Sequence, residues 1–326
     1  MKNKSCIALF SGGLDSLLVV KFMESLGYKV IPVFFETPFF EAGNAREVAE
    51  ANGIDLQVID VFDEYLPVLR NPRYGYGKNI NPCVDCHGFM FRKAGKLLEV
   101  WGADFLISGE VLGQRPMSQR KDTMNAVGKL SEVKDLLVRP LSQKLLADTL
   151  PIKEGWVIKD EMLDIQGRGR QRQIALAREF GIVNFQSPGG GCKLTDVKYA
   201  RRLKDLMKYE QISYANVRFL KYGRHFRLNE TTKLVVGRHK QDNDHLSLLT
   251  KDEIVIKAVD IHGPMGVLIK AGKPTDQEIE LSASIVLRYN NSVGDDADVA
   301  WGENFSLSNM VHVSKLDTDT VAGLMV

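Results

Sequence analysis

Cys6-Ile-Ala-Leu-Phe-Ser-Gly-Gly-Leu-Asp-Ser16 is the stretch that decides how the first half of this chain folds. Residues 6–10 form a short, continuous apolar run, which is typical of a buried strand. After Ser11-Gly12-Gly13, apolar residues recur at helical spacing until Gly27, where glycine favours the end of a helix. The stretch therefore predicts a buried strand, a tight turn and a helix, in that order.

The same alternation continues along the chain. Segments that favour strands and helices follow one another in the order 29–35, 41–52, 56–62, 88–101 and 104–110. Strands that alternate with helices predict a parallel sheet with helices on both faces, and ligands of such sheets bind where the strands end. The turn at Ser11 and the segment Ser108-Gly-Glu110 are therefore expected at one crevice.

The second half of the chain has a different pattern. Residues 142–212 are mostly helical in pattern, and short strand-like segments begin near residue 215. These segments cover 226–228, 233–237, 254–259 and 266–270, and they are followed by a predicted helix at 275–290. The predicted fold class is α/β, a Rossmann-like parallel sheet with a helical connector and a C-terminal α+β domain. The predicted boundaries are 1–150, 151–212 and 213–326.

Composition places the chain among ordinary globular proteins. Its 326 residues are 44% hydrophobic and 26% charged, and the formal net charge is +2, which fits two domains. The charge is unevenly spread, because the segment from Arg168 to Arg202 is strongly basic and the segment after Asp295 is acidic. This asymmetry predicts a local surface for a polyanion.

Features of the sequence also bear on the compartment. No apolar stretch approaches the ~18 residues that a membrane span requires, and the apolar run at residues 6–10 is too short for a signal peptide. Four cysteines in a chain of this length do not form a disulfide framework. We therefore expect a cytoplasmic protein with no membrane partner.

The turn after the first strand has the chemistry of a phosphate site. Gly12 and Gly13 lack Cβ atoms, so backbone N–H groups can surround an anion at the start of the following helix. Ser11 and Ser16 add hydroxyl donors, and Asp15 can hold a Mg²⁺ ion. The turn is not a Walker A loop, because no Gly-Lys-Ser/Thr follows it. The alternative is an ordinary strand–helix turn in which glycine only provides tightness.

Ser11-Gly-Gly-Leu-Asp-Ser16 resembles the PP-loop of GMP synthetase, asparagine synthetase and tRNA thiolation enzymes. Members of that class cleave ATP between the α and β phosphates. The resemblance implies that the chain uses ATP and Mg²⁺. The nucleotide-binding residues predicted on this basis are Ser11, Gly12, Gly13, Asp15, Ser16, Phe35, Gly109 and Gln114.

Three cysteines outside the apolar runs form a second candidate site. Cys83 and Cys86 lie in Asn81-Pro-Cys-Val-Asp-Cys-His87, and Cys192 follows a glycine-rich lead beside Lys193. A pair of thiols two residues apart can bind a metal, exchange a disulfide or be inert. The position of Cys192 predicts an accessible thiol with a lowered pKa. The three thiols could bind three irons of a [4Fe–4S] cluster and leave the fourth free to carry sulfide.

Further motifs make the resemblance more specific. Asn81-Pro-Cys-Val-Asp-Cys86, residues 102–119 and Val138-Arg-Pro-Leu141 resemble the ATPase core of tRNA 4-thiouridine synthases. The chain also shares Ser-Gly-Gly-x-Asp-Ser and Asn-Pro-x-x-x-Cys with tRNA 2-thiouridylases. These likenesses imply tRNA thiolation, with Asp15, Cys86 and Cys192 as catalytic residues. The target nucleotide stays open, because 4-thiouridine synthases carry an N-terminal tRNA-binding region before the PP-loop.

The last hundred residues resemble the RNA-binding domain of the NFACT proteins. The likeness rests on residues 226–270 and on the predicted helix that follows them. It implies RNA contacts, and the candidates are Arg238, Lys240 and Lys270. The alternative is a charged, solvated loop. A second basic cluster comprises Arg168, Arg170 and Arg172. We expect this cluster to contact the RNA backbone; the alternative is a helix start whose arginines face water.

Together these features predict an ATP-dependent tRNA sulfurtransferase. A uracil oxygen would attack the α phosphate of ATP, pyrophosphate would leave, and sulfur on a cluster or a Cys192 persulfide would displace AMP. The expected partners are tRNA and a sulfur donor, either sulfide or a persulfide carrier. Two alternatives remain: an adenylating enzyme that acts on a small molecule, and an RNA-binding protein that only holds a nucleotide.

Overall fold

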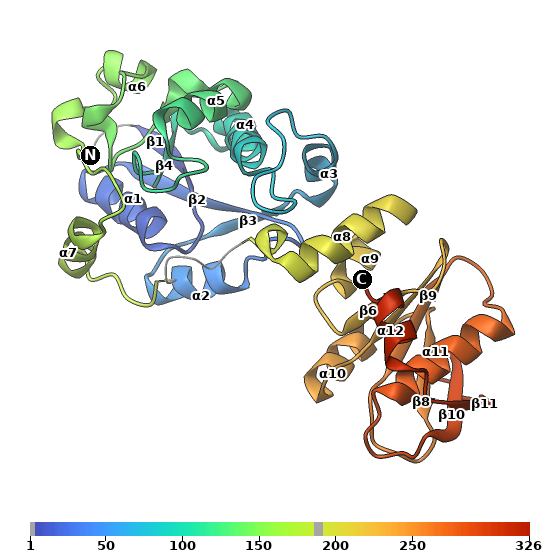
Figure 1. Cartoon of the computed structure of the whole chain (residues 1–326). Helices are drawn as coiled ribbons and strands as arrows, with labels where there is room; N and C mark the ends of the chain where they lie inside the picture. Colours follow the sequence, from blue (N-terminus) through green and yellow to red (C-terminus); the bar gives the residue numbers. More distant parts are fainter. Residues whose placement is uncertain (1–3, 186–191) are drawn as a thin grey trace. The chain divides into compact units, whose positions relative to one another are not determined.

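The computed structural model describes residues 4–185 and 192–326. The chain divides into two compact units, Met1–Thr195 and Asp196–Val326 (Figure 1). The glycine-rich lead before Cys192 lies outside the described residues. The finer division at residues 150 and 212 remains a prediction.

A parallel sheet forms the centre of the first unit. Its strand order is β3-β2-β1-β4-β5, and every pair in it is parallel, as predicted. The strands are β1 (Ser5–Leu9), β2 (Lys29–Glu36), β3 (Gln57–Asp60), β4 (Phe105–Ser108) and β5 (Leu137–Val138). The chain proceeds from β1 to β2 in one direction and continues from β4 in the other, so the strand order reverses between β1 and β4. Ligands of open α/β sheets bind at such a reversal.

Two groups of helices pack on this sheet (Figure 1): α1 with α7, and α4 with α3 and α5. The helices of this unit are α1 (Leu14–Ser25), α2 (Gly43–Ala51), α3 (Phe62–Arg70), α4 (Cys83–Trp101), α5 (Lys121–Ser131), α6 (Leu150–Lys153) and α7 (Gln171–Glu179). Helix α1 is buried almost all round, with Leu17, Leu18, Val19 and Val20 fully inaccessible to solvent. The turn that precedes α1 is therefore held by a rigid core element.

Helix α4 begins five residues earlier than predicted, at Cys83 rather than at residue 88. Pro82 occupies the N-cap position, and proline is tolerated there because the first helical N–H groups have no partner within the helix. Gly102 ends the helix in the left-handed conformation, with a φ of 61°. The early start places Cys83 and Cys86 in the first turn of a helix rather than in a loop.

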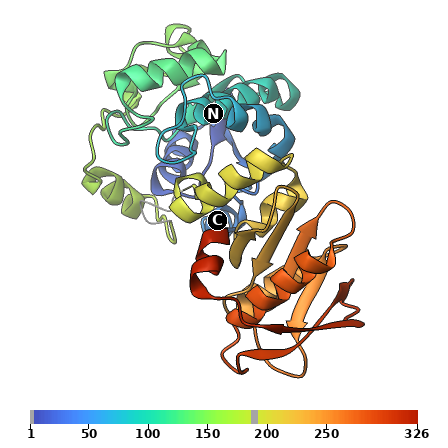
Figure 2. The same ribbon diagram turned by 45° about the vertical axis from the view of Figure 1, so that its right-hand side comes forward.

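The second unit is an antiparallel sheet with helices on both faces. Its strand order is β11-β10-β8-β9-β7-β6. The strands are β6 (Arg224–Arg227), β7 (Thr232–Val236), β8 (Ile254–Ala258), β9 (Gly266–Lys270), β10 (Asp296–Glu303) and β11 (Asn309–Ser314). The helices are α8 (Val197–Tyr209), α9 (Tyr214–Phe219), α10 (Lys240–Leu249), α11 (Asp276–Arg288) and α12 (Thr318–Leu324). Figure 2 shows α11 lying across the strands.

Alternating residues of β7 serve the two faces of this sheet. Leu234 belongs to the core under α11, and Val235 belongs to the core with Phe219 of α9 and Leu246 of α10. Helix α8 is attached by buried ion pairs, because its Asp205 contacts Arg227 at 2.7 Å and Lys233 at 3.5 Å. The predicted fold class, a parallel sheet followed by an α+β domain, is confirmed.

Among residues 4–185 and 192–326, no helix has both the length and the apolar character that crossing a bilayer requires.

Candidate active site

Hydroxyl and amide groups shape the turn between β1 and α1. Gly12 has a φ of 75°, a left-handed conformation that glycine adopts at little cost. The hydroxyl of Ser16 donates to the carbonyl oxygen of Gly13 at 2.8 Å and accepts from the amide of Ser11 at 3.2 Å. These bonds close the turn at the start of α1, where helix N–H groups favour an anion. This turn, residues 11–16, has the geometry expected of a phosphate-binding loop and is called the phosphate loop here.

The Asp15 carboxylate lies in this turn and is only partly satisfied. Its Oδ2 atom accepts from Gln114 Nε2 at 2.7 Å and lies 3.8 Å from Arg170 Nη2. Its Oδ1 atom and the Nε atom of Arg170 are buried without a hydrogen-bond partner among the described residues. Burial raises the pKa of Asp15, and the hydrogen bond from Gln114 and the charge of Arg170 oppose that rise.

The unpaired atoms fit ATP and magnesium. A carboxylate oxygen is a ligand that Mg²⁺ prefers, and a guanidinium N–H suits a phosphate oxygen. Asp15 Oδ1 and Arg170 Nε are therefore chemically suited to the ion and to a phosphate group. Phe35 is buried near the end of β2, and its contact with a nucleotide remains a prediction.

Gly109 brings the end of β4 against the phosphate loop. A Cβ atom at this position would lie 2.4 Å from the carbonyl oxygen of Asp15 and 2.8 Å from the amide nitrogen of Ser16. Real Cβ atoms do not approach backbone that closely, so only glycine lets the end of β4 lie against the first turn of α1 here. Gly109 and Gln114 both lie against Asp15, and their predicted contact with a nucleotide remains a prediction.

Helix α7 contributes residues that sequence reasoning did not assign to this site. Gln173 is fully buried, and its Nε2 atom donates to Gln114 Oε1 at 2.9 Å. Arg170, at the N-cap of α7, faces Asp15. Its predicted contact with the RNA backbone remains a prediction. Of its predicted companions, Arg172 pairs with Asp164 at 2.8 Å and Arg168 is exposed. RNA contacts by Arg168 and Arg172 remain predictions.

Cys192 lies close to Cys83 and Cys86, although it is distant from them in the sequence. Cys83, Cys86 and Cys192 lie close enough for each pair to interact electrostatically. Within the described part of the chain, no three His, Cys, Asp or Glu side chains are grouped so as to hold a metal ion. The described arrangement therefore does not form the predicted [4Fe–4S] site.

The acidity of the thiols differs from the prediction. Burial raises the pKa of Cys192 to about 11, so the expectation of a lowered pKa at this residue is wrong. Burial also raises the pKa of Cys86. Burial opposes ionisation of Cys83 too, but a hydrogen bond with His87, the charge of His87 and a hydrogen bond with Ser118 lower its pKa overall. Cys83 is thus the thiol that ionises most readily in this group.

A buried carboxylate orients the histidine beside Cys83. Glu110 Oε1 lies 3.2 Å from His87 Nδ1, and Glu110 Oε2 accepts from Arg139 Nε at 2.8 Å. Burial alone would raise the pKa of Glu110, but the charge of Arg139 and the hydrogen bond from His87 lower it to about 2. Desolvation lowers the pKa of His87, and its bonds to Cys83 and Glu110 outweigh that effect and raise it to about 10. Glu110 and Arg139 lie in motifs quoted above, but the sequence alone gave them no role.

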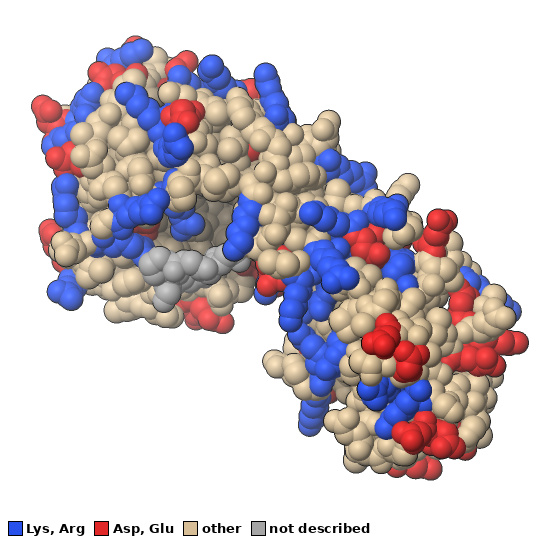
Figure 3. Space-filling model, viewed as in Figure 1, with Lys and Arg blue, Asp and Glu red and all other residues tan. Residues whose placement is uncertain are grey.

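Arg115 connects the two groups of residues. Cys83, Cys86 and Cys192 are together called the thiol group here. The positive charge of Arg115 lowers the pKa of Asp15 in the phosphate loop and also the pKa of Cys83 in the thiol group. One exposed side chain is therefore within electrostatic reach of both. On the face drawn in Figure 3, the first unit is hollowed, and Lys and Arg side chains lie at the rim of the hollow. The phosphate loop and the thiols are linked through neighbouring residues, because Gly109 packs against Asp15 and Glu110 contacts His87 beside Cys83.

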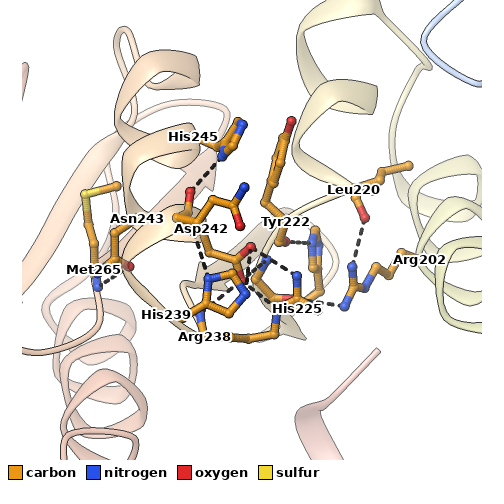
Figure 4. Close-up of polar contacts among 12 residues, drawn as sticks. Arg202, Leu220, Tyr222, His225, Arg238, His239, Asp242, Asn243, His245 and Met265 are labelled. Carbon is orange, nitrogen blue, oxygen red and sulfur yellow. Dashed lines mark hydrogen bonds and ion pairs between the residues drawn. The ribbon is translucent and has the colours of Figure 1, made fainter. Parts of the chain in front are cut away.

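In the second unit, a charged and aromatic cluster surrounds the start of α10 (Figure 4). Arg238 is 39% exposed and pairs with buried Asp242, whose Oδ2 atom also accepts from the amide of Gly223 at 3.1 Å. The rings of Tyr222 and His245 stack at 4.4 Å. The alternative of a charged, solvated loop does not describe these residues, because Lys240 begins a helix.

The predicted RNA contacts of this unit differ in their surroundings. Arg238 and Lys240 are exposed at the start of α10, and Lys and Arg side chains gather over this part of the unit in Figure 3. Lys270 instead forms an ion pair of 2.5 Å with Glu278 of α11 and is 15% exposed. An RNA contact by Lys270 remains a prediction.

Residues 223–323 match the family model described as NFACT protein RNA binding domain. The C-terminal unit contains an NFACT-type RNA-binding domain. This domain includes β6 to β11 with α10 and α11, and the resemblance predicted for the last hundred residues is confirmed.

The chain is also similar to curated tRNA-specific 2-thiouridylases MnmA, as predicted. The relative from Petrotoga mobilis is 29% identical over 136 residues, which cover 34% of this chain and 36% of that protein. The relative from Campylobacter concisus is 26% identical over 172 residues, which cover 46% of this chain and 49% of that protein. The chain thus spans between about a third and a half of the length of these two relatives.

Among solved structures, a crystal structure of a 4-thiouridine synthetase–RNA complex with bound ATP covers 56% of this chain and 52% of that chain. The sequence identity is 18% and the TM-score is 0.36. At this TM-score the likeness carries no weight for the site.

The close approach at Gly109 is directly testable. We expect Gly109→Ala to weaken ATP binding by at least about tenfold, because the added methyl group must push the end of β4 away from Asp15. Gly43→Ala is the matched control, since a Cβ atom at Gly43 meets nothing within 4 Å. Isothermal titration calorimetry with ATP measures both variants, and equal affinities would contradict the role given to Gly109.

The lowered pKa of Glu110 makes stability depend on pH. The carboxylate contributes stability that is complete above its usual pKa of 4.5 and is lost as the pH falls toward its folded value of about 2. The loss should be on the order of 3 kcal/mol. Urea unfolding of the wild type and of Glu110→Gln should therefore give a stability difference that shrinks between pH 5 and pH 2. The exposed Glu47→Gln serves as control, and a constant difference would rule out this contribution.

Proposed function

We propose that this chain is an ATP-dependent tRNA sulfurtransferase that thiolates a uridine. The observation that supports it best is the pair Gly109-Glu110, because Gly109 packs against Asp15 and Glu110 Oε1 lies 3.2 Å from His87 Nδ1 beside Cys83. A phosphate loop beside thiols suits an enzyme that activates an oxygen and then replaces it with sulfur. The NFACT-type RNA-binding domain and the 2-thiouridylase relatives favour a tRNA substrate over a small molecule.

The first step is adenylation of the base. The β and γ phosphates of ATP lie on the amides of Gly12 and Gly13 and the hydroxyls of Ser11 and Ser16. The uracil oxygen attacks the α phosphorus, the bond to the β phosphate breaks, and pyrophosphate leaves. Asp15 would hold a magnesium ion, which would supply neutralisation of the charge on the departing pyrophosphate. Preorganised donors of this kind lower the barrier because they need no rearrangement during the step.

The second step replaces AMP with sulfur. A persulfide on Cys192, loaded by a sulfur donor, attacks the activated carbon with its outer sulfur, and AMP leaves. The thiolate of Cys83 or Cys86 then attacks the Cys192 sulfur, so the base keeps the outer sulfur and the two cysteines form a disulfide. An external thiol reductant must restore them. Sulfide on a [4Fe–4S] cluster remains the second candidate carrier, although the described residues hold no group arranged for it.

The first step depends on Asp15. We expect Asp15→Asn to slow tRNA-stimulated pyrophosphate release by on the order of 10²–10³, because the amide is a poorer magnesium ligand than a carboxylate. A coupled pyrophosphate assay with purified chain, ATP and tRNA measures this rate. The exposed Asp55→Asn in the same unit is the control. Release at the normal rate by Asp15→Asn would show that this residue has a different role.

The cysteines should be required only after adenylation. We expect Cys192→Ser and the double variant Cys83→Ser/Cys86→Ser to form little or no thiouridine in tRNA, as mass spectrometry of the nucleosides would show, while tRNA-stimulated pyrophosphate release persists. Cys6→Ala is the matched control, because Cys6 is buried in β1 and takes no part in the thiol group. Thiouridine formation by the serine variants would exclude these thiols as sulfur carriers. Iron analysis of anaerobically purified chain tests the cluster.

A further inference from the structure

Large apolar side chains are exposed together beside the thiol group. They lie in the segment 71–81 between α3 and α4, called here the aromatic loop, and in the segment that carries Arg115. Tyr74 is 48% exposed, Tyr76 is 41% exposed and Met117 is 49% exposed. The reaction steps described above use none of these three side chains.

The aromatic loop is held in place by hydrogen bonds to buried and backbone groups. The buried carboxylate of Asp85 accepts from the amide of Arg73 at 2.7 Å and from the amide of Tyr74 at 2.9 Å. The hydroxyl of Tyr76 donates to the carbonyl oxygen of Leu69 at 2.6 Å. Asp85 lies between Cys83 and Cys86 in the first turn of α4. The backbone position of Tyr74 is therefore tied to the first helical turn that carries these two thiols.

Other contacts connect the loop with the rest of the thiol group. A Cβ atom at Gly77 would lie 2.9 Å from the terminal methyl carbon of Met117, so the Met117 side chain lies against the loop. Ser118, the next residue, interacts with Cys83. At the far end of the loop, Asn79 Nδ2 donates to the carbonyl oxygen of Thr195 at 2.7 Å, three residues after Cys192. The loop is thus anchored next to all three cysteines.

The charge of this surface is positive. Residues 70–81 contain Arg70, Arg73 and Lys78, all exposed, and no aspartate or glutamate. Exposed aromatic rings interleaved with cations are the features that recognise unstacked bases and their phosphates. An acidic polymer with flat aromatic groups, that is RNA in single-stranded form, matches both properties, whereas a duplex offers no base faces.

We propose that the aromatic loop, with Met117, binds the unstacked target nucleotide of the RNA and presents its base to the thiol group. The proposal rests on the proposed function, since it names the place where that reaction receives its base. Tyr74 is the stacking residue, and Arg73 and Lys78 bind the flanking phosphates. Tyr76 supports the loop through its bond to Leu69.

Photocrosslinking tests the site without relying on the reaction. The probe is a short single-stranded oligouridylate with one internal 4-thiouridine, irradiated with the full chain and mapped by mass spectrometry of peptides. We expect crosslinks in residues 71–81 and at Met117. Tyr74→Ala should weaken binding of the oligouridylate at the aromatic loop by about ten- to a hundredfold, and the crosslinks in residues 71–81 should fall accordingly. Crosslinks confined to residues 196–326 would overturn the proposal.

Matched variants separate stacking from other effects. Tyr74→Phe keeps the ring and should retain the crosslinks, and Val100→Ala, at a side chain 73% exposed on α4, should change nothing. Unchanged ATP binding by Tyr74→Ala shows that the fold is retained. If Tyr74→Ala crosslinks as the wild type does, the loop does not stack the base.

The reaction and the base site can fail independently. Tyr74→Ala should raise the KM for tRNA in pyrophosphate release more than it changes the rate with ATP alone. If the loop crosslinks but tRNA does not stimulate pyrophosphate release, the proposed reaction is wrong and the RNA site stands. If tRNA stimulates release and the loop does not crosslink, the reaction stands and the base site is wrong.

Discussion

The backbone of Gly109 lies so close to the first turn of α1 that a Cβ atom would come within 2.4 Å of the Asp15 carbonyl oxygen. This contact joins the end of β4 to the start of α1 at the reversal of strand order. Gln114 follows five residues later and reaches Asp15, and Gln173 of α7 holds Gln114 in turn. The phosphate loop, the segment after β4 and α7 are therefore positioned by one another, and all of them depend on this close approach.

Buried charge organises the other half of the site. Glu110, directly after Gly109, is shared between Arg139 and His87, and a buried carboxylate is tolerable only when it is paired in this way. His87 interacts with Cys83, so the strand end that closes the phosphate loop also sets the surroundings of a thiol. Gly109 and Glu110 are neighbours, so the phosphate loop and the thiol group are coupled through one strand end. This coupling suits a reaction in which the same base is first activated and then receives sulfur.

Several features were accessible from the sequence because they depend on local pattern. The alternation of apolar strands and helices predicted the parallel sheet, and the Ser-Gly-Gly turn predicted the phosphate loop. Another prediction failed because distant contacts decide it: the neighbours of Cys192 in the chain predicted a lowered pKa, but burial raises it. The sequence did not predict the surroundings of Arg170 either, because the packing of α7 against α1 places its guanidinium 3.8 Å from Asp15. The RNA contact of Arg170 remains a prediction.

The order of elements, the composition of the phosphate loop and the identity of the thiols could be read from the chain, because backbone preference and chemical type belong to each residue. Which of these groups meet depends on how distant segments pack. That packing brought Cys192 to Cys83 and Cys86, placed Glu110 against His87, and set the backbone amides of Arg73 and Tyr74 on the Asp85 carboxylate. Such encounters follow from the packing of segments far apart in the chain, and the burial that shifts a pKa exists only after that packing has formed.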